Sequence, residues 1–213
     1  MPSRAIKTFA ELDLDVANLL GQHSSTGTVG RPKGDNGPIL RSAVVLMATA
    51  WENYVELAIM QAFEHVLGVI AHDHSLLVGG VRTAVEAKGK RDPWTLAGPG
   101  WVNTARSLVE QQVRELNNAG PGQVDGLIHF AFGLEDFVEG LGWKGQKRGS
   151  IVPELAKLIN DVRGDIVHKG KTTEPLRKPT VERWRKFLGK LVEAMDRELA
   201  AQVDARCGST PWP

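Results

Sequence analysis

The stretch "PILRSAVVLMATAWENYVELAIMQAFEHVLGVIA" (residues 38–71) decides the fold. Pro38 suits the first turn of a helix, where the missing N–H of proline costs nothing. Apolar residues then recur every three or four positions and wrap most of the helix surface. They are Leu40, Val44, Met47, Trp51, Tyr54, Ala58, Ala62 and Val66. The pattern predicts one long helix that is buried on most sides and lies at the centre of the fold.

The rest of the chain reads as shorter helices joined by loops. Helical spacing of apolar residues predicts further helices near residues 8–20, 101–118, 123–141, 151–169 and 180–203, the last one capped by Thr180. We find no alternating strand pattern and no repeat. The sequence therefore predicts an all-α protein, most simply an antiparallel helical bundle. We expect a single domain over residues 1–205, with a flexible loop at 22–37 and a loose tail at 206–213.

Composition excludes several classes of protein. The 213 residues carry a formal net charge of +1, so the chain is not a polycation of the histone kind. Its one cysteine, Cys207, cannot form an intrachain disulfide, which favours a reducing compartment. The N-terminus turns acidic before any signal-like apolar run, and the longest apolar run, 43–51, is too short to span a bilayer. We expect a soluble cytoplasmic protein without a membrane partner.

The stretch "NDVRGDIVHKGK" (160–171) holds an arginine and a histidine five positions apart at a predicted helix end. Five residues correspond to about 140° around a helix, so the side chains of Arg163 and His168 do not stack on one another. They could flank a common ligand, or they could meet their copies across a twofold axis. Histidine moves protons near neutral pH, and arginine grips phosphate oxygens. The pair could support attack of a ribose 2′-OH on the adjacent phosphate, with no metal or other cofactor. The alternative is a basic helix terminus favoured by the helix dipole.

Positive charge is concentrated around this pair. Residues 163–190 hold nine Lys or Arg and three acids, a local net charge of +6 in a chain of +1. Such a concentration is what a phosphate-binding surface requires. The residues that we expect to contact RNA are Lys169, Lys171, Arg177 and Lys178. The alternative is a last helix that simply has a solvated basic face.

Three stretches in this order resemble the HEPN superfamily, and in particular its RiboL-PSP-HEPN branch. They are "AVVLMATAWENYVELA" (43–58), "FGLEDFVEGLGWKGQ" (132–146) and the Arg–His segment itself. The resemblance covers residues 38 to about 200. It implies an α-helical bundle, usually a homodimer, that cleaves RNA without a metal and leaves a 2′,3′-cyclic phosphate. It also implies a bacterial toxin or defence effector, with Arg163 and His168 as the catalytic pair.

Three further residues are candidates for supporting this pair. Glu52 lies in a mostly apolar helix, where an unpaired carboxylate is costly, so it either pairs with Arg163 or faces solvent with Glu56. Asn53 could line the same cleft. In the family, the residue after the motif arginine is usually polar. Here it is Gly164, and Asp165 follows as the side chain that could orient His168 or hold Arg163.

Other residues with reactive or aromatic side chains are weaker candidates for a functional site. His65, His72 and His74 lack a clear ligand geometry, so we predict no metal site. The tryptophans at 94, 101 and 143 could stack on bases, although core positions are the commoner use. Two functions compete with the ribonuclease: a non-catalytic module that binds RNA or protein, and a toxin component held inactive by an antitoxin.

Overall fold

The computed structural model describes residues 2–23, 37–71, 73–147 and 149–212, and over these residues all regular structure is helical. The prediction of an all-α helical bundle is confirmed. Most of the expected loop at 22–37 lies outside the described residues. The elements, in chain order, are α1 (Arg4–Gln22), α2 (Gly37–Val69), η1 (His74–Leu76), α3 (Gly79–Arg91), η2 (Pro93–Leu96), α4 (Gly100–Arg114), α5 (Pro121–Phe132), α6 (Phe137–Gly140), α7 (Ile151–Ala156), η3 (Lys157–Arg163), α8 (Gly164–Lys169) and α9 (Lys178–Cys207).

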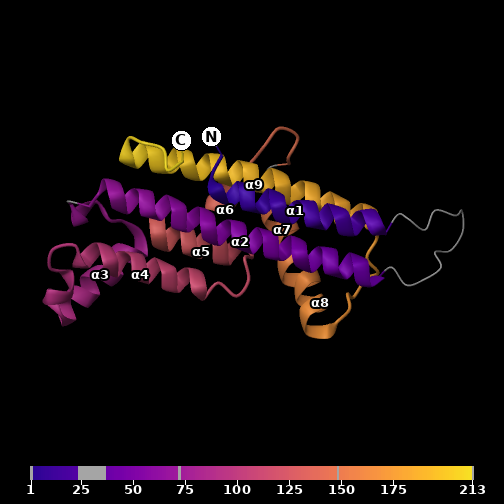
Figure 1. The fold of residues 1–213 in the computed structure, drawn as a ribbon, viewed down its shortest axis with the longest axis horizontal. Coiled ribbons are helices and arrows are strands. Elements are labelled where there is room, and N and C mark those ends of the chain that lie inside the picture. Colours follow the sequence, from indigo (N-terminus) through magenta and orange to yellow (C-terminus); the bar gives the residue numbers. More distant parts are fainter. Residues whose placement is uncertain (1, 24–36, 72, 148, 213) are drawn as a thin grey trace, which may run out of the picture.

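Three long helices, α1, α2 and α9, run along the long axis of the molecule (Figure 1). Polar contacts fix their directions. Ser3 at the start of α1 contacts Asp196 in the second half of α9, while Asp13 binds Arg185 near the start of α9. Arg4 contacts Gln61 far along α2. Helix α1 therefore runs antiparallel to both of its neighbours, and α2 and α9 run in the same direction. The expected uniformly antiparallel arrangement is wrong for this pair.

Helix α2 forms the centre of the core, as its apolar pattern predicts. Trp51, Tyr54 and Phe63 are completely buried. The indole of Trp51 stacks on Tyr54, with ring centroids 5.9 Å apart. By length and composition alone α2 could cross a bilayer, but 56% of its most apolar window is already buried inside the bundle.

Three sequence-based boundaries were wrong for identifiable reasons. The helix expected over 123–141 breaks at Gly133, whose φ of +69° ends α5 before α6 begins. Helix α9 begins at Lys178 rather than after Thr180, because Pro179 occupies its first turn. The C-terminal residues are not a loose tail: Trp212 is 5% exposed, and His65 Nε2 lies 2.9 Å from Ser209 Oγ.

The predicted helix over 151–169 is continuous but not regular. It consists of α7, a π-helical segment (η3) and α8, and it crosses the long helices steeply (Figure 1). Gly170, with φ of +68°, ends it in the left-handed conformation, as expected for a helix stop. We call α7, η3 and α8 together the motif helix, since it carries Arg163 and His168.

Candidate functional site

The site begins at the middle of α2, where two neighbouring side chains face different partners. The Trp51 indole donates a hydrogen bond of 2.7 Å to the carbonyl oxygen of Ala119, in the segment before α5. This bond fixes that segment against α2. Glu52, the next residue, is directed toward the motif helix.

Glu52 pairs with Arg163 across the two helices. The Glu52 Oε1 and Arg163 Nη2 atoms lie 3.3 Å apart, and the two side chains are 19% and 20% exposed. Of the two alternatives that the sequence left open for Glu52, the structure therefore has the pairing with Arg163. Its geometry is that of an ion pair rather than a directed hydrogen bond, because Glu52 Oε1 has no hydrogen-bond partner among the described residues. The guanidinium carries five N–H donors, so most of its donors remain available for another anion.

Burial dominates the electrostatics of Glu52. Desolvation raises the pKa of its carboxyl above the ordinary value of 4.5, although Arg163 and a backbone hydrogen bond from Ala119 oppose the rise. The pKa of Glu56, one turn further along α2, is also raised by burial and by the charge of Glu52. Arg163 therefore lies beside an acidic, poorly solvated stripe of α2 that holds its guanidinium in place.

The π-helical segment Lys157–Arg163 sets the direction of the arginine. Each π-type hydrogen bond reaches one residue further along the chain than in an α-helix, so the side chains after it point in directions that a regular helix would not give. Arg163 is the last residue of this segment. Residues 157–163 contain no glycine or proline that would indicate an irregular helix. The spacing of apolar residues, which assumes a regular α-helix, therefore could not locate the π-helical segment.

Two asparagines that sequence reasoning missed join the segment before α5 to the π-helical segment that ends at Arg163. Asn118 Nδ2 donates a hydrogen bond of 3.1 Å to Asn160 Oδ1, which belongs to the π-helical segment. The Oδ1 atom of Asn118 is buried and, like Glu52 Oε1, has no hydrogen-bond partner among the described residues. Both asparagines occur in loop-like or polar sequence that gives no local signal of their meeting.

His168 contrasts with Arg163. It lies in α8, which contributes no buried residue, and its ring is exposed. No hydrogen bond or ion pair joins it to any described residue. Asn53 is half-buried on α2 and has no hydrogen bond to either motif residue. The structure thus brings Glu52 to Arg163, whereas none of the described residues is a polar partner of His168.

Asp165 has a different role from the one expected. It accepts hydrogen bonds from Lys169 Nζ (2.6 Å) and Thr173 Oγ1 (2.7 Å), and it contacts neither Arg163 nor His168 by a hydrogen bond. These two bonds, Lys169 first, hold the pKa of the Asp165 carboxyl below its ordinary value. Asp165 therefore fixes the loop after the motif helix instead of orienting the histidine.

The basic segment, residues 163–190, has fewer unpaired positive charges in the structure than its sequence suggests. Six of its nine cations form ion pairs, several with acids from other elements: Arg163 with Glu52, Lys169 with Asp165, Lys178 with Glu182, Arg183 with Glu154, Arg185 with Asp13 and Lys190 with Glu193. Within the part of the chain that the structure describes, Lys171, Arg177 and Lys186 have no ion pair. Of the four cations expected to contact RNA, Lys171 and Arg177 are thus the two with free charge.

The remaining candidates are distributed over the molecule. Trp101 is buried and packs on His74, with ring centroids 6.2 Å apart. Trp143 packs on Phe187, whereas Trp94 is 85% exposed. No group of three His, Cys, Asp or Glu side chains with metal-ligand geometry occurs among the described residues.

Comparison of the chain with family models, curated proteins and solved structures gave no match.

Proposed function

We propose that the protein is a metal-independent endoribonuclease of HEPN type. The observation that carries the proposal is the asymmetric pair on the motif helix. Arg163 is held by Glu52 and keeps free N–H donors, while the exposed His168 follows it at the end of the same helix. An anion clamp and a solvent-accessible proton acceptor, here five positions apart on one helix, are the two groups that the proposed RNA transesterification uses.

In the proposed reaction, His168 accepts the proton of a ribose 2′-OH. The 2′ oxygen forms a bond to the adjacent phosphorus, and the bond from phosphorus to the 5′ oxygen breaks. Arg163 donates hydrogen bonds to the phosphate oxygens, which gain negative charge in the transition state. The 5′ oxygen takes up a proton from the imidazolium or from solvent. The products are a 2′,3′-cyclic phosphate and a 5′-hydroxyl end.

We propose further that the active form is a homodimer. Val167, beside His168, is 50% exposed although it is β-branched and apolar. A second copy packed on this end of the motif helix would bury Val167 and bring two pairs together. Light scattering should show a dimer, and Val167→Asp should yield monomers with lower activity. A monomeric wild type at assay concentration would contradict the dimer.

The proposed activity is tested by incubating wild-type protein with a mixed RNA pool in EDTA and mapping the ends of the products. We expect 2′,3′-cyclic phosphate ends from wild type and no products from His168→Ala. His129→Ala, which changes another exposed helical histidine, is the matched control and should cleave like wild type. Cleavage by His168→Ala at the wild-type rate would contradict the proposal.

A second candidate function is a non-catalytic RNA-binding module. It is favoured because no hydrogen bond from a described residue fixes the His168 tautomer. In that case wild type should retain RNA without cutting it. Binding should then survive His168→Ala but weaken in Arg163→Ala and with salt.

A further inference from the structure

Helix α3 and the η2 turn carry the most exposed tryptophan of the described residues. We call residues 79–96, which contain both elements, the Trp94 segment. Trp94 is 85% exposed, whereas four of the other five tryptophans are at most 8% exposed. The backbone at Trp94 is fixed nonetheless, because the Asp92 carboxylate accepts hydrogen bonds from the Trp94 amide (3.1 Å) and from the Thr95 hydroxyl (2.7 Å).

Leu96 anchors the η2 turn to the rest of the protein. Its side chain packs against the core, and the turn contacts both α3 and α4. A Cβ added at Gly89 of α3 would overlap the Leu96 side chain, so glycine at this position lets the turn pack closely on α3. Asp92 and Leu96 thus hold the turn, while the Trp94 ring stays in solvent and adds little to the core.

Three cations lie in the last turn of α3, just before the tryptophan. Lys88, Lys90 and Arg91 are exposed, and none of them forms an ion pair with a described residue. Glu86, the only acid of α3, pairs with Arg82 at 2.9 Å, and this contact more than the charge of Lys90 lowers the pKa of its carboxyl. The helix dipole favours cations at this end of α3, but it does not account for an exposed indole beside them.

We propose that the Trp94 segment binds single-stranded RNA outside the cleavage site. Every base has a π-face, so an exposed indole can stack on RNA of any sequence. Lys88, Lys90 and Arg91 provide the positive charge that holds the phosphates on either side of the stacked base. The proposal rests on the proposed function and deepens it, because it adds a second contact for the same RNA.

The arrangement of the helices gives this RNA a length. In Figure 1, α3 lies near one end of the long axis and α8 toward the other, both on the same side of α2. The part of α2 from Glu52, the partner of Arg163, to its end at Val69 is about 25 Å long. A strand of several nucleotides, but not a dinucleotide, could therefore contact Arg163 and the Trp94 segment together.

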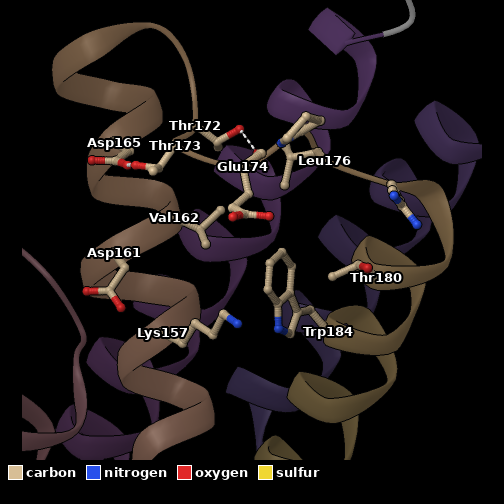
Figure 2. Close-up of a pocket in the computed structure, with 12 residues that line it drawn as sticks. Lys157, Asp161, Val162, Asp165, Thr172, Thr173, Glu174, Leu176, Thr180 and Trp184 are labelled. Atoms are coloured by element: carbon tan, nitrogen blue, oxygen red, sulfur yellow. Dashed lines mark hydrogen bonds between the residues drawn. The ribbon is translucent and has the colours of Figure 1, made fainter.

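The loop after the motif helix offers further contacts at the Arg163 end of this strand. It carries Lys171 and Arg177, which have no ion pair with a described residue. Figure 2 shows the loop passing from Thr172 over Glu174 to α9. The two basic regions differ in that only the Trp94 segment has an exposed aromatic ring, so loss of stacking is the specific sign of its use.

The test measures binding of a fluorescein-labelled 2′-O-methyl RNA, whose blocked 2′ oxygen cannot attack the phosphate. We expect Trp94→Ala to bind about tenfold more weakly than wild type, and Trp94→Phe, which keeps a ring, to retain most of the affinity. Leu14→Ala, which removes an exposed apolar side chain of α1, is the matched control and should bind like wild type. Changing Lys88, Lys90 and Arg91 together to Gln should lower the slope of log affinity against log salt by about 2.

Two outcomes would overturn the proposal. One is wild-type affinity in Trp94→Ala, and the other is an unchanged salt slope in the triple variant. If Trp94→Ala bound the RNA normally but lost binding to vesicles of phosphatidylcholine and phosphatidylserine, the segment would be assigned to a membrane surface instead.

This readout separates the Trp94 segment from the proposed activity. Trp94-dependent binding by a protein that cuts no RNA would support the segment and remove the ribonuclease. Cleavage of long RNA by Trp94→Ala with wild-type KM, together with unchanged binding, would support the ribonuclease and remove the segment. If both hold, Trp94→Ala should raise KM for long oligonucleotides while kcat changes little, and cleavage of a dinucleotide should be unaffected.

Discussion

Arg163 and His168 belong to one helix, yet their surroundings differ. Arg163 ends a π-helical segment packed on α2 and pairs with a half-buried carboxylate at 3.3 Å. His168 follows in a short α-helical end from which no side chain is buried. The arginine is a fixed part of the fold, whereas the histidine is an exposed group that the fold does not need. A phosphate clamp benefits from fixation, and a proton carrier benefits from access to substrate and solvent.

The largest expected effect is on activity at the exposed end. His168→Ala should lower the rate of RNA cleavage by about 100- to 10,000-fold, the usual contribution of a general acid–base group. Because the side chain has no partner in the described structure, the free energy of unfolding should change by less than about 0.5 kcal/mol. Single-turnover cleavage and urea unfolding of the same preparation check both. A large loss of stability would show that the fold does need His168, and would contradict the difference described between Arg163 and His168.

Changes at the fixed end should affect stability as well as activity. Arg163→Ala leaves the Glu52 carboxylate without its countercharge, which should lower the free energy of unfolding by about 1–2 kcal/mol. Adding Glu52→Gln to that variant should recover most of the loss, since the uncompensated charge is then absent. Urea unfolding of the two single variants and the double variant measures the coupling. Strictly additive effects would show that the two side chains do not interact.

The raised pKa of Glu52 predicts how stability depends on pH. The folded state holds this proton more tightly than the unfolded state, whose pKa is near the ordinary value of 4.5. The contribution of Glu52 to stability is therefore greatest at low pH and declines as pH rises above 4.5 through the folded pKa. Glu52→Gln should remove that part of the decline, as measured by urea unfolding of both proteins from pH 4 to pH 8. Parallel pH curves for wild type and variant would contradict the raised pKa.

The smallest expected effect concerns Gly164, the residue between Arg163 and Asp165 on the motif helix. Its φ of −56° is helical, and an added Cβ would meet nothing within 4 Å. Gly164→Ala should therefore stabilise the protein by about 0.5–1 kcal/mol with unchanged cleavage. Thermal unfolding of Gly164→Ala beside wild type measures this gain. A destabilised variant would mean that the turn between Arg163 and His168 needs the flexibility of glycine.

Local pattern was enough to predict the helices, and it reduced one contact of the site to two alternatives. The apolar spacing of α2 located the central helix, and the cost of an unpaired carboxylate left two alternatives for Glu52, of which pairing with Arg163 is the one observed. Local pattern could not show that Asp13 and Glu154 neutralise arginines of α9, because these partners are far apart in sequence. The π-helical segment and the Asn118–Asn160 contact also depend on packing between helices. The same holds for burial of Trp212, which a polar, proline-containing terminus does not suggest.

The most direct test of the proposed chemistry removes a single atom, the 2′ oxygen, from the substrate. A cleaved oligonucleotide is resynthesised with a 2′-deoxy residue at the mapped cut site and incubated with wild-type protein in EDTA. If a ribose 2′-OH attacks the phosphate as proposed, cleavage at that position disappears while neighbouring sites are still cut. Unchanged cleavage of the deoxy-substituted position would contradict 2′-OH attack and the roles assigned to His168 and Arg163.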